Sequence, residues 1–180
     1  MGAVSATALV WTSSLEAECV ETEDNIEGPF YKAGAPERTA LLEPGMKGTP
    51  LTVSGQVLDT RCRPLARAIL DVWQCDADGV YDNSGYTLRG KIQADTKGRY
   101  ELRTILPPPY RVAADRSRPS HIHLKVSAAG AAVLTTQLYF EGDKWNAVDS
   151  AYRRSLTISP VEGRNGMRAA QFDFKLKAAG

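Results

Sequence analysis

The two histidines of the chain lie two residues apart, in the segment His121-Ile122-His123. Ile122, Leu124 and Val126 alternate with polar positions, which is typical of a strand with one buried face. Because strand side chains alternate between faces, both imidazoles should project from the same side, about 6–7 Å apart. Two neutral imidazoles placed in this way can bind one metal ion. For an isolated His-x-His motif, the alternative is a solvated strand face.

Tyrosine is the most abundant source of further ligands for such an ion. No cysteine, Asp or Glu flanks the histidine pair, whereas the chain contains seven tyrosines. A phenol has a pKa of about 10, so it binds as phenolate only to a strongly Lewis-acidic ion such as ferric iron. Two phenolates, two imidazoles and one hydroxide would balance the charge of Fe³⁺, which lowers the cost of burying it. A zinc or ferrous site would instead recruit a carboxylate such as Asp71 or Asp76.

The elements that must position these residues are short strands. From residue 51 onward, alternating or apolar segments are separated by turn residues, and they predict strands over 51–58, 68–74, 100–105, 121–126, 133–140, 156–159 and 169–176. Only 145–153 has a weak helical pattern. We therefore expect an all-β fold, an antiparallel β-sandwich with little helix. Residues 28–50 are rich in Gly and Pro and predict a long N-terminal arm, while Trp73 and Tyr100 are expected inside the sandwich.

Composition limits the organisation and the partners of the chain. Its 180 residues fit one domain, which we place at 22–180 after an N-terminal extension over 1–21, either a trimmed export signal or an arm. A net charge of +1 without a Lys/Arg run predicts neither a nucleic-acid nor a membrane partner. Cys62 and Cys75 lie near opposite ends of a predicted strand, too far apart to bond, so a disulfide would use Cys19 and one of them. A bridge favours an exported protein and free thiols a cytoplasmic one; we favour export, periplasmic or secreted.

Six segments in succession resemble the intradiol ring-cleavage dioxygenases, the catechol and protocatechuate dioxygenases among them. They are TEDNIEGPFY (22–31) with AGAP (33–36), CRPL (62–65) leading to DVWQCDADGVY (71–81), GRYELRTI (98–105), PY (109–110), RPSHIH (118–123) and TTQLYFEG (135–142). The resemblance implies cleavage of a catechol-type diol by O₂ between its two hydroxylated carbons, giving a muconate-type dicarboxylate. It also implies one non-haem Fe³⁺ per chain.

The resemblance assigns the metal ligands residue by residue. Tyr81 and His121 would be equatorial ligands, and Tyr110 and His123 would be axial. Tyr110 would also be catalytic, because a substrate that displaces it can give it a proton. Without the resemblance, Tyr81 could be an aromatic residue that caps a turn and Tyr110 a residue that fills a loop.

The resemblance also predicts the substrate site. Arg118 and Gln137 would be catalytic and bind substrate by stabilising charge on the ring, and Tyr139 shares a strand face with Gln137. Ile26 and Pro29 would form part of the pocket wall. Too few residues precede Ile26 for the helical dimerisation domain of the catechol-cleaving enzymes, so we expect a compact stand-alone form, with a homo-oligomer left open.

The sequence departs from the family pattern at two positions, and two other functions are compatible with its strands. Ser120 replaces the usual Ala or Gly, and no proline follows Tyr110, which leaves substrate choice open. The rivals are a non-catalytic transthyretin-like β-sandwich that binds a ligand, and a metal hydrolase with a His/carboxylate site.

Overall fold

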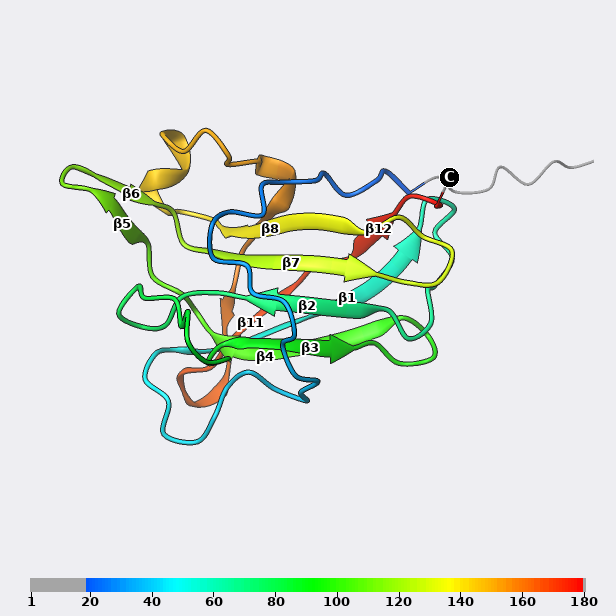
Figure 1. The fold of residues 1–180 in the computed structure, drawn as a ribbon, viewed down its shortest axis with the longest axis horizontal. Helices are drawn as coiled ribbons and strands as arrows, with labels where there is room; N and C mark the ends of the chain where they lie inside the picture. The colour runs from blue at the N-terminus through cyan, green and yellow to red at the C-terminus, as the bar shows by residue number, and fades with distance from the viewer. Residues whose placement is uncertain (1–18, 180) are drawn as a thin grey trace, which may run out of the picture.

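A computed structural model describes residues 19–179, which form two five-stranded sheets packed face to face (Figure 1). One sheet has the order β10-β11-β1-β12, with β4 also paired to β1, and the other has the order β3-β2-β7-β8-β9. The strands are β1 (Pro50–Asp59), β2 (Ile69–Trp73), β3 (Arg89–Gln93), β4 (Arg99–Ile105), β7 (His121–Ser127), β8 (Leu134–Phe140), β9 (Thr157–Ile158), β10 (Val161–Glu162), β11 (Arg168–Gln171) and β12 (Phe174–Leu176). A separate hairpin is formed by β5 (Tyr110–Ala113) and β6 (Arg116–Arg118).

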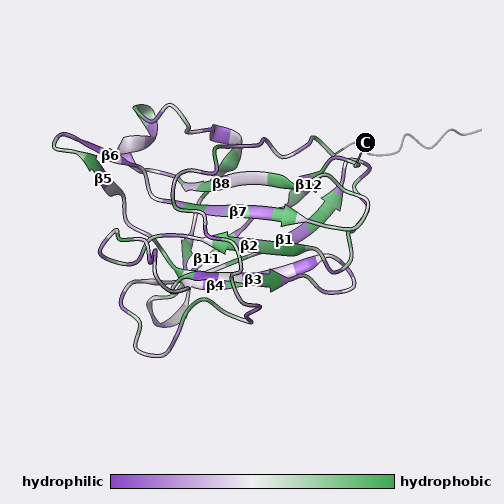
Figure 2. Ribbon diagram, viewed as in Figure 1, coloured by the Kyte–Doolittle hydropathy of each residue, from purple (hydrophilic) through white to green (hydrophobic). Residues whose placement is uncertain are grey.

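The main core lies between the two sheets. On β7, Ile122, Leu124 and Val126 are fully buried in it, as their alternation predicted. Tyr100 is also part of this core, where its hydroxyl donates a hydrogen bond to the Phe172 carbonyl (2.7 Å). Figure 2 shows both hydrophobic and hydrophilic residues along the strands, as is typical of strands with one buried face. The remaining side chains of β7, including both histidines, therefore face outward from the sandwich.

The prediction of a β-sandwich is confirmed, but some of its elements differ. The segment 169–176 is two strands rather than one, and both β11 and β12 run parallel to β1, as β9 does to β8. Strand β3 was not predicted because only one of its residues, Ile92, has a large apolar side chain. The short β5, β6 and β10 were also not predicted.

The helix predicted over 145–153 is wrong. Only the 3-10 helix η1 (Lys144–Ala147) forms there, and η2 (Arg154–Leu156) and η3 (Arg164–Gly166) are equally short. Asp143 accepts a hydrogen bond from the Trp145 amide (2.9 Å), and Asp149 accepts one from the Ala151 amide (2.8 Å). Such local bonds from aspartate to backbone compete with helical bonding and favour turns.

The N-terminal arm, which was predicted over 28–50, extends in the structure from Cys19 and crosses the outer face of the β3-β2-β7-β8-β9 sheet (Figure 1). The Asn25 amide donates to the Thr135 carbonyl on β8 (2.8 Å), and the Lys91 amide on β3 donates to Pro36 (2.8 Å). A disulfide between Cys19 and Cys62 joins the start of the arm to the turn after β1. The arm therefore covers the histidine face of β7.

The disulfide confirms that Cys19 is bridged, with Cys62 as its partner, while Cys75 is a buried free thiol. The predicted extension over 1–21 lies outside the described residues except for its last three. Within residues 19–179, no helix has the length and hydrophobicity that a membrane crossing needs.

Candidate metal centre

The two histidines converge beneath the arm. Their Nε2 atoms lie 3.1 Å apart, and each residue is 1% exposed. Two nitrogens bound to one ion at about 2.1 Å, with about a right angle between them, lie about 3 Å from each other. The spacing of His121 and His123 therefore matches two neighbouring ligands of a single ion.

The surroundings of the two imidazoles keep them neutral and orient them. Nδ1 of His121 lies 2.6 Å from the Pro119 carbonyl, and since a carbonyl only accepts, Nδ1 carries the hydrogen and Nε2 presents a lone pair. The His123 ring stacks on Trp73, with centroids 4.9 Å apart and planes at 7°. Burial, with a contribution from Arg118, lowers the pKa of His121 to about 3 and that of His123 well below its usual value. Neutral imidazole is the form that metal binding requires.

The two tyrosines predicted as ligands complete the cluster. Tyr81 Oη is 3.4 Å from His121 Nε2. The Tyr110 ring lies perpendicular to Tyr81, with centroids 5.5 Å apart, and 5.5 Å from the ring of His121. Burial raises the pKa of both phenols, so a strongly Lewis-acidic ion must supply the compensation for phenolate formation. The structure thus brings all four predicted ligands together from three separate segments.

The turn after β2 determines where Tyr81 lies. The Asp76 carboxylate accepts hydrogen bonds from the amides of Asp78 and Val80, both at 2.9 Å. Gly79 has φ +78°, and a Cβ at this position would lie 3.2 Å from the Cβ of Tyr110. Glycine therefore allows both the left-handed turn and its close approach to Tyr110 at the start of β5.

The residues present fit a hard trivalent ion better than the alternative zinc or ferrous site. Among residues 19–179, no group of three or more His, Cys, Asp and Glu side chains is arranged to hold a metal. Asp71 instead accepts a hydrogen bond from Tyr31 Oη (3.2 Å), and Asp76 is part of the turn described above. Two imidazole nitrogens and two phenol oxygens form a donor set suited to Fe³⁺.

Arg118 places a fixed positive charge beside this donor set. Its Nε donates to Asp149 (2.8 Å), its Nη2 donates to Gln137 Oε1 (3.1 Å) and Tyr139 Oη (3.2 Å), and its Nη1 lies 3.5 Å from His121 Nε2. Burial disfavours the positive charge of Arg118. The hydrogen bond to Asp149 and the negative charge of that carboxylate outweigh the effect of burial, so the pKa of Arg118 is raised. The guanidinium is therefore charged and held in one orientation.

Gln137 links Arg118 to the arm. It is fully buried; its Nε2 donates to the Ile26 carbonyl (2.7 Å), and its Oε1 accepts from Arg118 and Tyr139. Both the oxygen and the nitrogen of the side-chain amide are thus hydrogen-bonded, and Gln137 is not among the residues that line the pocket described below. The substrate contact predicted for it remains a prediction.

A pocket of about 520 Å³ opens beside the cluster. Ile26 and Pro29 line it, as predicted, and Tyr81, Tyr110 and Arg118 lie in its wall. Its volume is within the range of pockets that take small organic ligands.

Trp73 and Asp149 lie near the site but were not predicted for it. The prediction that Trp73 lies inside the sandwich is wrong, because it pairs with His123 across β2–β7 and faces outward with it. Its alternation with Leu70 and Val72 could have shown this. Asp149, the ion-pair partner of Arg118, lies in an irregular loop and has no comparable signal in the sequence.

The chain is similar to known dioxygenases over most of its length. A family model described as Dioxygenase matches residues 26–178. A chlorocatechol 1,2-dioxygenase of Pseudomonas putida is 33% identical over 175 residues, which is 84% of this chain and 66% of the relative. A catechol 1,2-dioxygenase of Acinetobacter baylyi is 34% identical over 167 residues, 78% of this chain and 54% of the relative. The chain therefore spans somewhat more than half of the length of these relatives.

Solved structures show the same similarity. The dioxygenase domain of a dioxygenase carbohydrate-binding protein fusion from Streptomyces sp. SirexAA-E is 40% identical with a TM-score of 0.79, covering 88% of this chain and 99% of that domain. The 3-chlorocatechol 1,2-dioxygenase of Rhodococcus opacus is 32% identical with a TM-score of 0.83, and the match covers 88% of this chain and 73% of that one.

Proposed function

The chain belongs to the intradiol ring-cleavage dioxygenase family, and from this premise we propose that it opens catechol-type aromatic diols with O₂, using one non-haem ferric ion. The observation that carries the proposal is the cluster of two neutral imidazoles and two buried phenol rings beside one pocket. The rival functions explain the strands, but neither accounts for this donor set.

The ion would be held by Tyr81, Tyr110, His121 and His123, and would supply a Lewis acid that favours loss of both diol protons. Of the four, Tyr110 is the most exposed, at 9%, and it lies at the start of the separate hairpin. Its phenolate would therefore be the better placed of the two to accept one diol proton at Oη.

Arg118 would stabilise negative charge that develops on the ring. Its guanidinium lines the pocket and is held by Asp149, Gln137 and Tyr139 before any substrate enters. A preorganised cation in a water-poor site stabilises developing charge without a further reorganisation cost. Gln137 contributes by orienting Arg118 and by attaching the arm that covers the site.

Oxygen uptake tests the proposal. The iron-loaded chain should consume one O₂ per catechol and release a muconate-type dicarboxylate, and Tyr81→Phe should lose iron and activity together. Tyr100→Phe changes a tyrosine in the sandwich core, away from the cluster, and should keep both. Turnover that persists in iron-free Tyr81→Phe would refute the proposal.

Export is a second, separate proposal. The Cys19–Cys62 bridge supports it, because structural disulfides persist in oxidising compartments. Finding the native protein in the cytoplasm with Cys19 and Cys62 reduced would contradict it.

A further inference from the structure

Arg89, the first residue of β3, is a buried cation that no carboxylate neutralises directly. It is 1% exposed, and none of the ion pairs among residues 19–179 includes it. Its Nη1 donates to the Phe30 carbonyl (2.5 Å), its Nε to the Asp82 carbonyl (2.7 Å) and its Nη2 to Asn83 Oδ1 (3.3 Å). Burying an arginine on neutral acceptors is costly, so its position calls for a reason other than fold stability.

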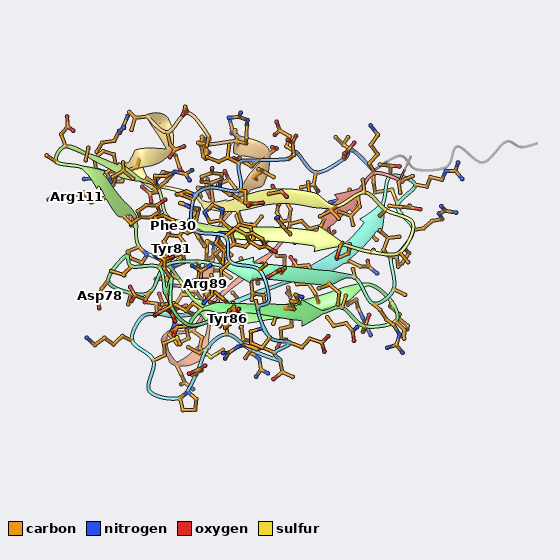
Figure 3. All side chains as sticks on the ribbon, viewed as in Figure 1. Phe30, Asp78, Tyr81, Tyr86, Arg89 and Arg111 are labelled. Carbon is orange, nitrogen blue, oxygen red and sulfur yellow. A yellow bond between two sulfur atoms is a disulfide. The ribbon has the colours of Figure 1, made fainter. Side chains whose placement is uncertain are left out.

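The groups that Arg89 binds are the immediate neighbours of Tyr81. Phe30, from the arm, stacks on the Tyr81 ring with centroids 4.3 Å apart and planes at 13°, and Asp82 is the next residue in the chain. The guanidinium carbon itself lies 5.9 Å from the centroid of the Tyr81 ring. Figure 3 shows Phe30, Tyr81 and Arg89 together at the end of the sandwich that carries the site.

We propose that Arg89 is a positioning residue for Tyr81, holding the ring between the arm and its own loop and placing a positive charge beside the phenolate. This inference rests on the proposed function, in which Tyr81 binds the ion as an anion. The hydrogen-bond acceptors of Arg89 are neutral and no carboxylate among the described residues forms a contact ion pair with it, so its positive charge can attract an anionic phenolate.

Two substitutions separate the charge of Arg89 from its hydrogen bonds. Arg89→Gln removes the charge, whereas Arg89→Lys keeps it and loses the planar fork that reaches Phe30 and Asp82 together. Val53→Ala is the matched control for lost stability, because it opens a small cavity in the core between the sheets.

The experiment measures three properties of each variant: the midpoint of thermal unfolding without metal, the affinity for ferric iron in competition with a chelator, and the wavelength of the visible tyrosinate-to-iron absorption band. Arg89→Gln should bind iron about 10- to 100-fold more weakly. Its band should shift to longer wavelength, because a phenolate without a nearby cation is a better electron donor. Arg89→Lys should lose affinity but keep the band closer to that of the wild type.

Val53→Ala should unfold at a lower temperature with wild-type affinity and band. An Arg89→Gln protein with the wild-type affinity and band would overturn the inference, whatever its unfolding temperature. Should Arg89→Gln not fold, wild-type iron affinity in Arg89→Lys would overturn it equally. A wild-type chain that binds no ferric iron would overturn the proposed function as well, which distinguishes the two failures.

Discussion

Replacing Asp149 by asparagine should impair both stability and turnover, because it removes the charge that holds Arg118. The two side chains are 14% and 8% exposed and meet at 2.8 Å, and the pKa of Asp149 is lowered because the Arg118 bond and charge outweigh its burial. Removing one partner of a buried pair costs about 3–5 kcal/mol. Arg118 keeps Gln137 and Tyr139 as acceptors, so we expect a smaller loss of about 2–3 kcal/mol, in the range of hydrogen bonds to charged groups.

Turnover should fall further than substrate binding, because a guanidinium that is free to rotate no longer meets developing charge in a fixed position. We expect kcat to fall by up to about 100-fold with little change in KM. Urea unfolding measures the loss of stability, and oxygen uptake with catechol measures kcat and KM.

Glu43→Gln is the control for this substitution. It breaks the ion pair between Arg38 and Glu43, whose separation of 2.6 Å is similar to that of the Arg118–Asp149 pair. The Glu43 side chain is 53% exposed and distant in sequence from the metal ligands, so turnover should not change. An Asp149→Asn enzyme with wild-type kcat would refute the argument that Asp149 orients Arg118.

Three further predictions concern the arm, the disulfide and the histidines. Gly28→Ala should destabilise the fold by about 1–3 kcal/mol and weaken iron binding, since Gly28 has φ +73° and a Cβ there would lie 3.2 Å from His123 Cε1. Urea unfolding measures the loss of stability, and competition with a chelator measures the loss of iron affinity. Unchanged iron affinity would contradict the expected effect on the metal site. Cys62→Ser should cost about 4 kcal/mol, because the bridge spans a sequence separation of 43 residues; a urea midpoint equal to that of the wild type would contradict this. The metal-free chain should lose stability as pH falls from 6.5 towards 3, because the unfolded chain protonates His121 in this window and the folded chain does not. The slope from His121 alone is about 1.4 kcal/mol per pH unit, and unfolding free energies that do not change between pH 7 and pH 5 would contradict it.

The positions of the two histidines on one face of a strand could be predicted from the alternation of residues in the sequence. Alternation on 121–126 predicted that His121 and His123 leave the core together while Ile122 enters it, and the structure confirms this. The same reasoning predicted most strands, because strands with one apolar face have a period of two.

Tyr81 and Tyr110 could be assigned only through the resemblance. Tyr81 follows a turn and Tyr110 follows a run of prolines, and no periodic pattern in the sequence shows that these two segments meet beside the histidines of β7. Strand β3 was missed because Arg89 and Gly90, although both are buried, are polar or small. Asp149 could not be predicted, since its partner depends on how an irregular loop folds back over β6.

A crystal structure of the iron-loaded chain, with the metal located by anomalous diffraction at the iron edge, would identify the ligands of the ion. We expect a single iron peak within bonding distance of Tyr81, Tyr110, His121 and His123. A peak bound through Asp71 or Asp76, or full occupancy at a position away from the two tyrosines, would contradict it.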